Sequence, residues 1–181
     1  MILHCIYKIT SDTMFINMSN ILIHLIYIIT NEWVIVIFVG IVAFYLVRRR
    51  RSFEAIELIS GIALTASLGL LLKSIIKIPR PESALIDIGG YGFPSIHSAI
   101  GITLASLIYV IFVRHLCTKD NRVLYDILLF IFAFGLGVTR LILGVHSTLD
   151  VLGGYVLGIV VSSLVIYFFY RIMRPVKHIK H

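Results

Sequence analysis

The chain consists mainly of long apolar runs separated by short polar links, and this pattern limits the folds open to it. Of its 181 residues, 59% are hydrophobic and only 14% are charged. A soluble domain is usually about one quarter charged. A run of about 20 apolar residues is long enough for a helix to cross a bilayer. The sequence therefore predicts an all-α, polytopic membrane protein.

The apolar runs predict a bundle of about six transmembrane helices. They are expected at residues 14–29, 33–47, 53–76, 95–116, 123–143 and 148–170. The first run is the least apolar, because it holds Asn17, Asn20 and His24. We expect a single domain over residues 1–181, with its polar motifs in a core at about 53–172. Small residues permit close helix contact, and those expected to face neighbouring helices are Gly61, Gly69, Gly153, Gly154 and Gly158.

The formal net charge of +7 comes from basic residues that follow apolar runs. The groups are Arg48 to Arg51, then Arg114, Lys119 and Arg122, then Arg171, Arg174, Lys177 and Lys180. Lys and Arg are enriched in cytoplasmic loops, so the charge indicates topology and not a nucleic-acid partner. The expected location is the inner (cytoplasmic) membrane of a cell. No small-residue cleavage site follows the first apolar run, so no signal peptide is expected. Cys5 and Cys117 fall on the reducing side and predict no disulfide.

Three polar clusters interrupt the apolar pattern. They are Lys73-x6-Arg80-Pro81, Pro94-Ser95-Ile96-His97 and Thr139-Arg140-x5-His146-x3-Asp150. The first closes the third run, the second opens the fourth, and the third joins the fifth to the sixth. Alternating helix direction places all three on one membrane face, opposite the basic groups, and hence facing outward. Charged groups at membrane depth are functional candidates.

The spacing of His146 and Asp150 is that of one helical face. A carboxylate there can hold one imidazole nitrogen and leave the other free to attack an electrophile. The competing interpretation is structural, because Asp150 could simply cap the sixth helix.

The remaining polar residues suit the binding of an anion. Lys73, Arg80 and Arg140 can stabilise the negative charge of a phosphoryl group in transfer, although each could instead snorkel to the interface. A helix that begins at Ser95 offers free N–H groups to a phosphate. His97 is placed to protonate a leaving oxygen; the alternative is a serine cap with an incidental histidine.

These three blocks resemble the signature of the type 2 phosphatidic acid phosphatase (PAP2) superfamily, which also includes vanadium haloperoxidases. That signature reads Lys-x6-Arg-Pro, Pro-Ser-Gly-His and Ser-Arg-x5-His-x3-Asp. The resemblance implies that His146 is the nucleophile, that Asp150 orients it and that His97 is the general acid. It implies a phosphohistidine intermediate, no metal and no cofactor. The positions it assigns to phosphate binding are Lys73, Arg80, Ser95, Ile96 and Arg140.

The chain departs from the signature at two positions. Thr139 replaces serine and keeps the hydroxyl. Ile96 replaces glycine, and a β-branched residue does not adopt positive φ as glycine does. We expect helical geometry at Ile96, which would leave the phosphate cradle intact.

Short chains of this layout resemble polyprenyl diphosphate phosphatases. The expected function is therefore removal of phosphate from an undecaprenyl- or dolichyl-type diphosphate carrier, with lipid phosphate and membrane lipids as the partners. The alternatives are a phosphatase for phosphatidic acid or phosphatidylglycerol phosphate, a vanadate-dependent haloperoxidase, and an inactive membrane protein.

Overall fold

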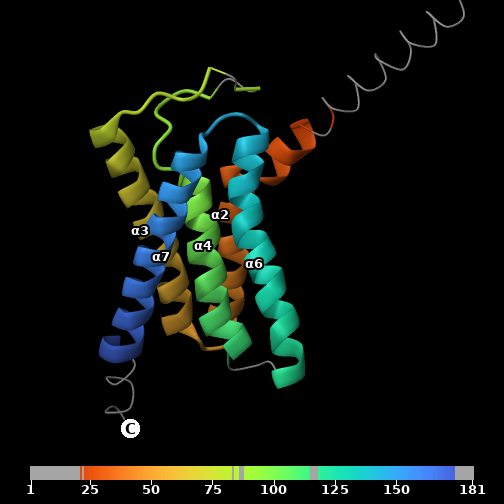
Figure 1. The fold of residues 1–181 in the computed structure, drawn as a ribbon. Coiled ribbons are helices and arrows are strands. Elements are labelled where there is room, and N and C mark those ends of the chain that lie inside the picture. Colours follow the sequence, from red (N-terminus) through yellow and green to blue (C-terminus); the bar gives the residue numbers. More distant parts are fainter. Residues whose placement is uncertain (1–20, 22, 83, 86–87, 115–117, 174–181) are drawn as a thin grey trace, which may run out of the picture.

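The computed structural model describes residues 21–173, except for residues 22, 83, 86–87 and 115–117. This part of the chain contains helices and no strands (Figure 1). In order, the elements are α2 (Glu32–Arg48), α3 (Ser52–Ile76), α4 (Ile96–Ile108), the π-helical η1 (Tyr109–Val113), α6 (Lys119–Ile142), α7 (Thr148–Phe168) and the π-helical η2 (Phe169–Met173). The all-α, polytopic class predicted from the sequence is confirmed.

Five helical segments within the described residues are long and apolar enough to cross a membrane. They are Ile23–Arg48, Ser52–Ile76, Ile96–Val113, Asn121–Ile142 and Thr148–Arg171. The prediction was about six. Half of the first predicted span lies outside the described residues. Its last turns continue through Thr30 and Asn31 into α2, so that these residues and α2 form one segment rather than two.

Helix α4 lies at the centre of the bundle. It packs against α3, α6 and α7, while α2 packs against α3 (Figure 1). Its inward side chains Leu104 and Leu107 are almost fully buried, as is Ile111 of η1, which continues it. The side chains of α2 and α6 that face outward are mostly apolar and exposed, as expected where lipid is the solvent.

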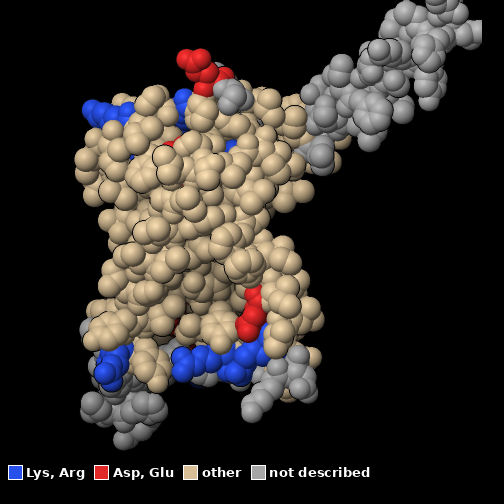
Figure 2. All heavy atoms as spheres, in the orientation of Figure 1, with Lys and Arg blue, Asp and Glu red and all other residues tan. Residues whose placement is uncertain are grey.

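The three polar clusters meet at one end of the bundle, and the basic groups lie at the other. The loops after α3 and after α6 share the upper end in Figure 1, where α4 and α7 begin. The described basic residues at the lower end are Arg48 to Arg51, Arg114, Arg122 and Arg171. Figure 2 shows a wide uncharged band around the middle of the visible face, with charged side chains gathered at the two ends. The predicted separation of motifs from basic groups is therefore present.

Helix α7 approaches the backbone of α4 so closely that only glycine fits between them. A Cβ added to Gly154 would lie 2.3 Å from the Ser95 carbonyl oxygen, and one added to Gly158 would lie 2.5 Å from that of Ala99. The Ser95 N–H donates to the Asp150 carbonyl at 2.9 Å. The predicted role of these glycines at helix contacts is confirmed, and the contact fixes the first turns of α4 and α7 side by side.

Gly154→Ala should therefore destabilise the protein, because the added methyl group meets backbone that cannot move aside. Overpacking of this kind costs on the order of 1–3 kcal/mol. A lower thermal midpoint in detergent would show it. Gly40→Ala is the matched control, since nothing lies within 4 Å of a Cβ at that position. Equal midpoints for the two variants would contradict the proposed contact.

Candidate active site

Six structural elements supply the predicted site residues. Lys73 lies in the last turn of α3, and Arg80 lies in the loop that follows. His97 lies in the first turn of α4, and Arg140 in the last turn of α6. His146 lies in the short connection to α7, whose first turn holds Asp150.

Asp150 caps α7 and also faces His146, so the structure contains both features expected of this carboxylate, while its role in orienting the histidine stays a prediction. Its Oδ2 accepts a hydrogen bond from the Ser147 N–H at 2.8 Å, and its own N–H donates to the Ser147 hydroxyl at 3.2 Å. This reciprocal pair is a capping box at the start of α7. The same Oδ2 lies 3.5 Å from Nδ1 of His146. The cap therefore fixes the carboxylate that faces the imidazole.

The environment of His146 keeps its ring neutral. Burial, followed by the positive charges of Lys73 and Arg80, lowers the pKa of His146 to about 4, although Asp150 opposes the shift. Nε2 of this ring lies 3.2 Å from Nη1 of Arg80. With a proton on Nδ1 facing Asp150, Nε2 carries the lone pair. A neutral imidazole with Nε2 directed toward a guanidinium is suited to attack a bound anion.

The three cations are held by backbone carbonyls and not by carboxylates. Lys73 Nζ donates to the carbonyls of Tyr91 and Gly92, the latter at 2.9 Å. Arg80 Nη1 donates to the Val145 carbonyl at 3.0 Å. A carbonyl fixes the position of a charged group without cancelling its charge. The cations therefore remain available to an anionic ligand.

Arg140 is buried beneath the site, with 2% of its surface exposed. Its Nη2 donates to the Thr30 carbonyl, between the first described helical turns and α2. This bond ties α6 to a part of the chain 110 residues away. Arg140 also lines the polar cavity of the site, as a phosphate-binding role requires.

Ser95 and Ile96 sit at the beginning of α4. The Ser95 side chain accepts from the Ser98 N–H and from the Ser98 hydroxyl, the latter at 2.9 Å, and is fully buried. Its predicted contact with phosphate stays a prediction. Ile96 is the first residue of α4 and does not have a positive φ, as expected. Its side chain packs over Gly69, where an added Cβ would lie 2.8 Å from the Ile96 Cγ1.

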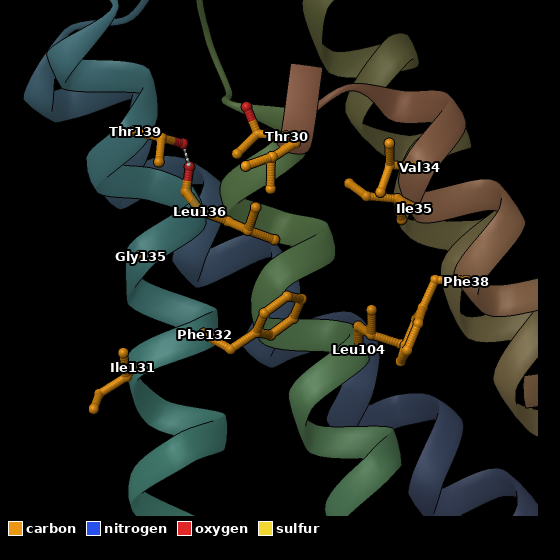
Figure 3. Close-up of a pocket in the computed structure, with 11 residues that line it drawn as sticks. Thr30, Val34, Ile35, Phe38, Leu104, Ile131, Phe132, Gly135, Leu136 and Thr139 are labelled. Carbon is orange, nitrogen blue, oxygen red and sulfur yellow. Dashed lines mark hydrogen bonds between the residues drawn. The ribbon is translucent and has the colours of Figure 1, made fainter. Parts of the chain in front are cut away.

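Thr139, by contrast, lies away from the catalytic residues. Its hydroxyl donates to the Leu136 carbonyl of its own helix at 2.8 Å. Figure 3 shows it at the edge of an apolar cavity of about 390 Å³ between α2, α4 and α6. No predicted catalytic histidine lines this cavity.

The predicted catalytic histidines, His97 and His146, lie where two other cavities meet. One, of about 300 Å³, is lined largely by polar and charged groups that include Arg140. The other, of about 480 Å³, extends between α2 and α3 along apolar side chains that include Val36 and Leu70. The residues that line both are Glu32, Arg80, Ile88, His97 and His146. The site can therefore accept a ligand with a charged end and an apolar end.

The sequence did not predict the wall that the N-terminal part of the chain contributes. Tyr27, Asn31 and Glu32 line the polar cavity, as do Ile88 and Gly89 of the loop before α4. Glu32 Oε2 lies 3.8 Å from Nε2 of His97. The available signal was weak: a carboxylate at the start of a spanning helix, on the same membrane face as the three clusters.

Comparisons with known proteins agree with this geometry. A profile of the PAP2 superfamily matches residues 54–174. This chain belongs to the PAP2 superfamily. Phosphatidylglycerophosphatase B of Bacillus subtilis (strain 168) is 31% identical over 128 residues. The matched region is 69% of this chain and 63% of that protein, so the chain spans less than two thirds of this relative.

Two solved structures share the fold. A crystal structure of a transmembrane PAP2-type phosphatidylglycerolphosphate phosphatase from Bacillus subtilis has a TM-score of 0.76 and 26% identity, covering 85% of this chain and 78% of that one. Aquifex aeolicus LpxE has a TM-score of 0.64 and 23% identity, covering 82% of this chain and 86% of its own. The second likeness concerns the fold alone. The sequence-based assignment to the PAP2 superfamily is thus confirmed.

The two roles of Asp150 can be separated by mutation. Asp150→Asn keeps a cap oxygen but removes the charge beside His146, so the turnover number for phosphate release should fall by about 10²-fold or more. Ser147→Ala removes the cap hydroxyl alone and should cost about 1 kcal/mol of stability, with most of the turnover retained. Thermal midpoints and turnover should be measured on both variants. A similar loss of turnover in both would show that Asp150 acts only as a cap.

The buried, neutral state of His146 also predicts how stability depends on pH. Between its ordinary pKa of 6.5 and the folded value of about 4, the unfolded chain binds more protons at this residue than the folded protein does. Stability should therefore fall as the pH falls through this window, by at most about 3 kcal/mol, and level off below it. Thermal midpoints of wild type and His146→Gln should diverge across this range. Parallel curves for the two proteins would contradict a buried, neutral His146.

Proposed function

We propose that this protein is a membrane lipid phosphatase that removes the terminal phosphate from a glycerolipid phosphate, with phosphatidylglycerol phosphate as its preferred substrate. The observation that carries the proposal is the position of the His146–Asp150 pair. It lies among Lys73, Arg80 and Arg140, where a polar cavity opens into an apolar groove. A lipid phosphate has the matching chemistry, because its charged end and apolar chain are adjacent.

The proposed reaction proceeds in two displacements. Nε2 of His146 attacks phosphorus, and the bond from phosphorus to the leaving oxygen breaks. His97 gives its proton to that oxygen, which releases the dephosphorylated lipid and leaves a phosphohistidine. Water then attacks phosphorus while His97 takes a proton from it, and orthophosphate departs with neutral His146 restored. The three cations stabilise charge on the non-bridging oxygens in both steps.

The apolar groove between α2 and α3 suits the lipid chain. Val36 of α2 is 57% exposed and Leu70 of α3 is 61% exposed. Ala66 is a small residue that lines the groove further along α3. A lipid tail that entered from the bilayer between α2 and α3 would place its phosphate next to His97 and His146.

The substrate preference follows from the relatives and not from the motifs. A protein 31% identical to this chain is named phosphatidylglycerophosphatase B, and a solved structure at 26% identity is a phosphatidylglycerolphosphate phosphatase. These relatives favour the glycerolipid alternative over the polyprenyl diphosphate function expected first from the sequence. The two classes differ at the phosphate, which is a monoester in one and part of an anhydride in the other.

The substrate test is phosphate release by the purified protein in detergent with EDTA. Phosphatidylglycerol phosphate, phosphatidic acid and undecaprenyl diphosphate should be offered separately. We expect kcat/KM to be highest for phosphatidylglycerol phosphate by about tenfold, a difference of about 1.4 kcal/mol. EDTA should have no effect, and His146→Ala should lower turnover by about 10⁴-fold or more.

Each other outcome has a definite meaning. Preference for the diphosphate would restore the polyprenyl function and refute the glycerolipid proposal. No release from any of the three lipids by folded protein would refute the lipid phosphatase proposal. Inhibition by EDTA would refute metal independence.

We further propose that the site faces away from the cytoplasm. The support is the position of the described basic residues at the opposite end of the bundle. In a variant with Cys5 and Cys117 replaced by serine, Glu82→Cys should react with a membrane-impermeant maleimide in intact cells. Reaction only after the membrane is opened would contradict this orientation.

A further inference from the structure

Glu32 brings a negative charge to the mouth of a site whose other charged groups are mainly cations. It is the first residue of α2 and lines both the polar cavity and the apolar groove. Its Oε2 lies 3.8 Å from Nε2 of His97. The distance is too long for a hydrogen bond but short for two opposite charges.

Cationic side chains gather around His97. Lys73 of α3, Arg80 of the following loop and Arg140 of α6 line the two cavities that His97 also lines, as does His146 of the connection to α7. Nε2 of His97 is buried and makes no hydrogen bond within the described residues. A general acid must carry a proton before the bond to the leaving oxygen breaks. Some negative charge is therefore needed beside this ring.

The backbone at Glu32 is held by its neighbours, while its side chain is 71% exposed. The Asn31 side chain accepts from the Trp33 N–H at 2.9 Å and caps α2. The carbonyl of Thr30 is bonded to the buried Arg140. These two contacts place the first residue of α2 against the site.

We propose that Glu32 is a positioning residue for His97. Its carboxylate stabilises the protonated imidazole and so keeps the proton available to the leaving oxygen. Glu32 transfers no proton itself, and the proton passes from His97 to the lipid oxygen as the bond to phosphorus breaks. The inference rests on the proposed lipid phosphatase function. Glu32 also lies outside residues 54–174, the region that matches the family, so the three motifs do not include it.

The test compares the pH dependence of kcat/KM for phosphatidylglycerol phosphate in wild type, Glu32→Gln and Glu82→Gln. In Glu32→Gln the basic limb of the profile should move down by about one pH unit, the size expected of a partly solvated charge pair. At pH values below this limb, kcat/KM of wild type and of Glu32→Gln should agree within about twofold. Glu82 is an exposed carboxylate in the loop after α3, so its variant is the matched control and should show no shift.

Two results would overturn the inference. One is an unchanged profile in Glu32→Gln. The other is an equal loss at every pH, arising mainly from KM, which would mean that Glu32 contacts the lipid and does not act through His97.

A second measurement does not depend on catalysis. In a double-mutant cycle of Glu32→Gln and His97→Gln, thermal midpoints should show coupling at low pH, where the ring is charged, and none at high pH. Absence of coupling at both pH values would overturn the inference. If wild type released no phosphate from any lipid, the proposed function would fail, while this cycle would still decide whether the two residues interact.

Discussion

The close contact between α4 and α7 determines the geometry of the whole site. Gly154 and Gly158 let the two helices approach until side chains meet backbone, and the Ser95 N–H bonds the Asp150 carbonyl at 2.9 Å. The first turns of both helices are thereby held side by side. One of these turns carries His97, and the other carries the carboxylate that faces His146. The same contact between α4 and α7 therefore positions the backbone at both the proposed acid, His97, and the carboxylate beside the proposed nucleophile, His146.

The second constraint is the placing of positive charge at the end of an apolar bundle. Lys73, Arg80 and Arg140 each donate to a backbone carbonyl, so their heads are fixed without a carboxylate in ion-pair contact among the described residues. A site organised in this way needs little rearrangement when an anion binds, which is the main source of electrostatic catalysis. Burial and the charges of Lys73 and Arg80 keep His146 neutral, and the cations line the cavities that His97 also lines. The arrangement thus favours a nucleophile at one histidine and requires a counter-charge at the other.

The spacing of the motifs was sufficient to predict most of the site. The four-residue spacing predicted that His146 and Asp150 share one helical face. The two side chains do lie 3.5 Å apart, but His146 precedes α7 in a non-helical connection, and the capping box at Ser147 places the carboxylate beside it. Alternating helix direction brought the three clusters to one end. The geometry of Ile96 followed from its place at a helix start. Glu32 and Thr30 could not be predicted in this way, because they come from a distant part of the chain, which the Arg140–Thr30 bond and the packing of α2 on α3 bring to the site. The motifs could not predict the substrate either, because their residues are expected to bind the phosphate and not the lipid attached to it.

In the proposed reaction, His146 carries the phosphoryl group during turnover. The most direct test is to mix the protein with lipid phosphate labelled with ³²P at its terminal phosphate, quench in alkali, and map the labelled peptide. We predict an alkali-stable, acid-labile label on the peptide that contains His146, and no label in His146→Ala. Rapid turnover with no label at any time point, or a label on another residue, would contradict the role of His146 as the nucleophile.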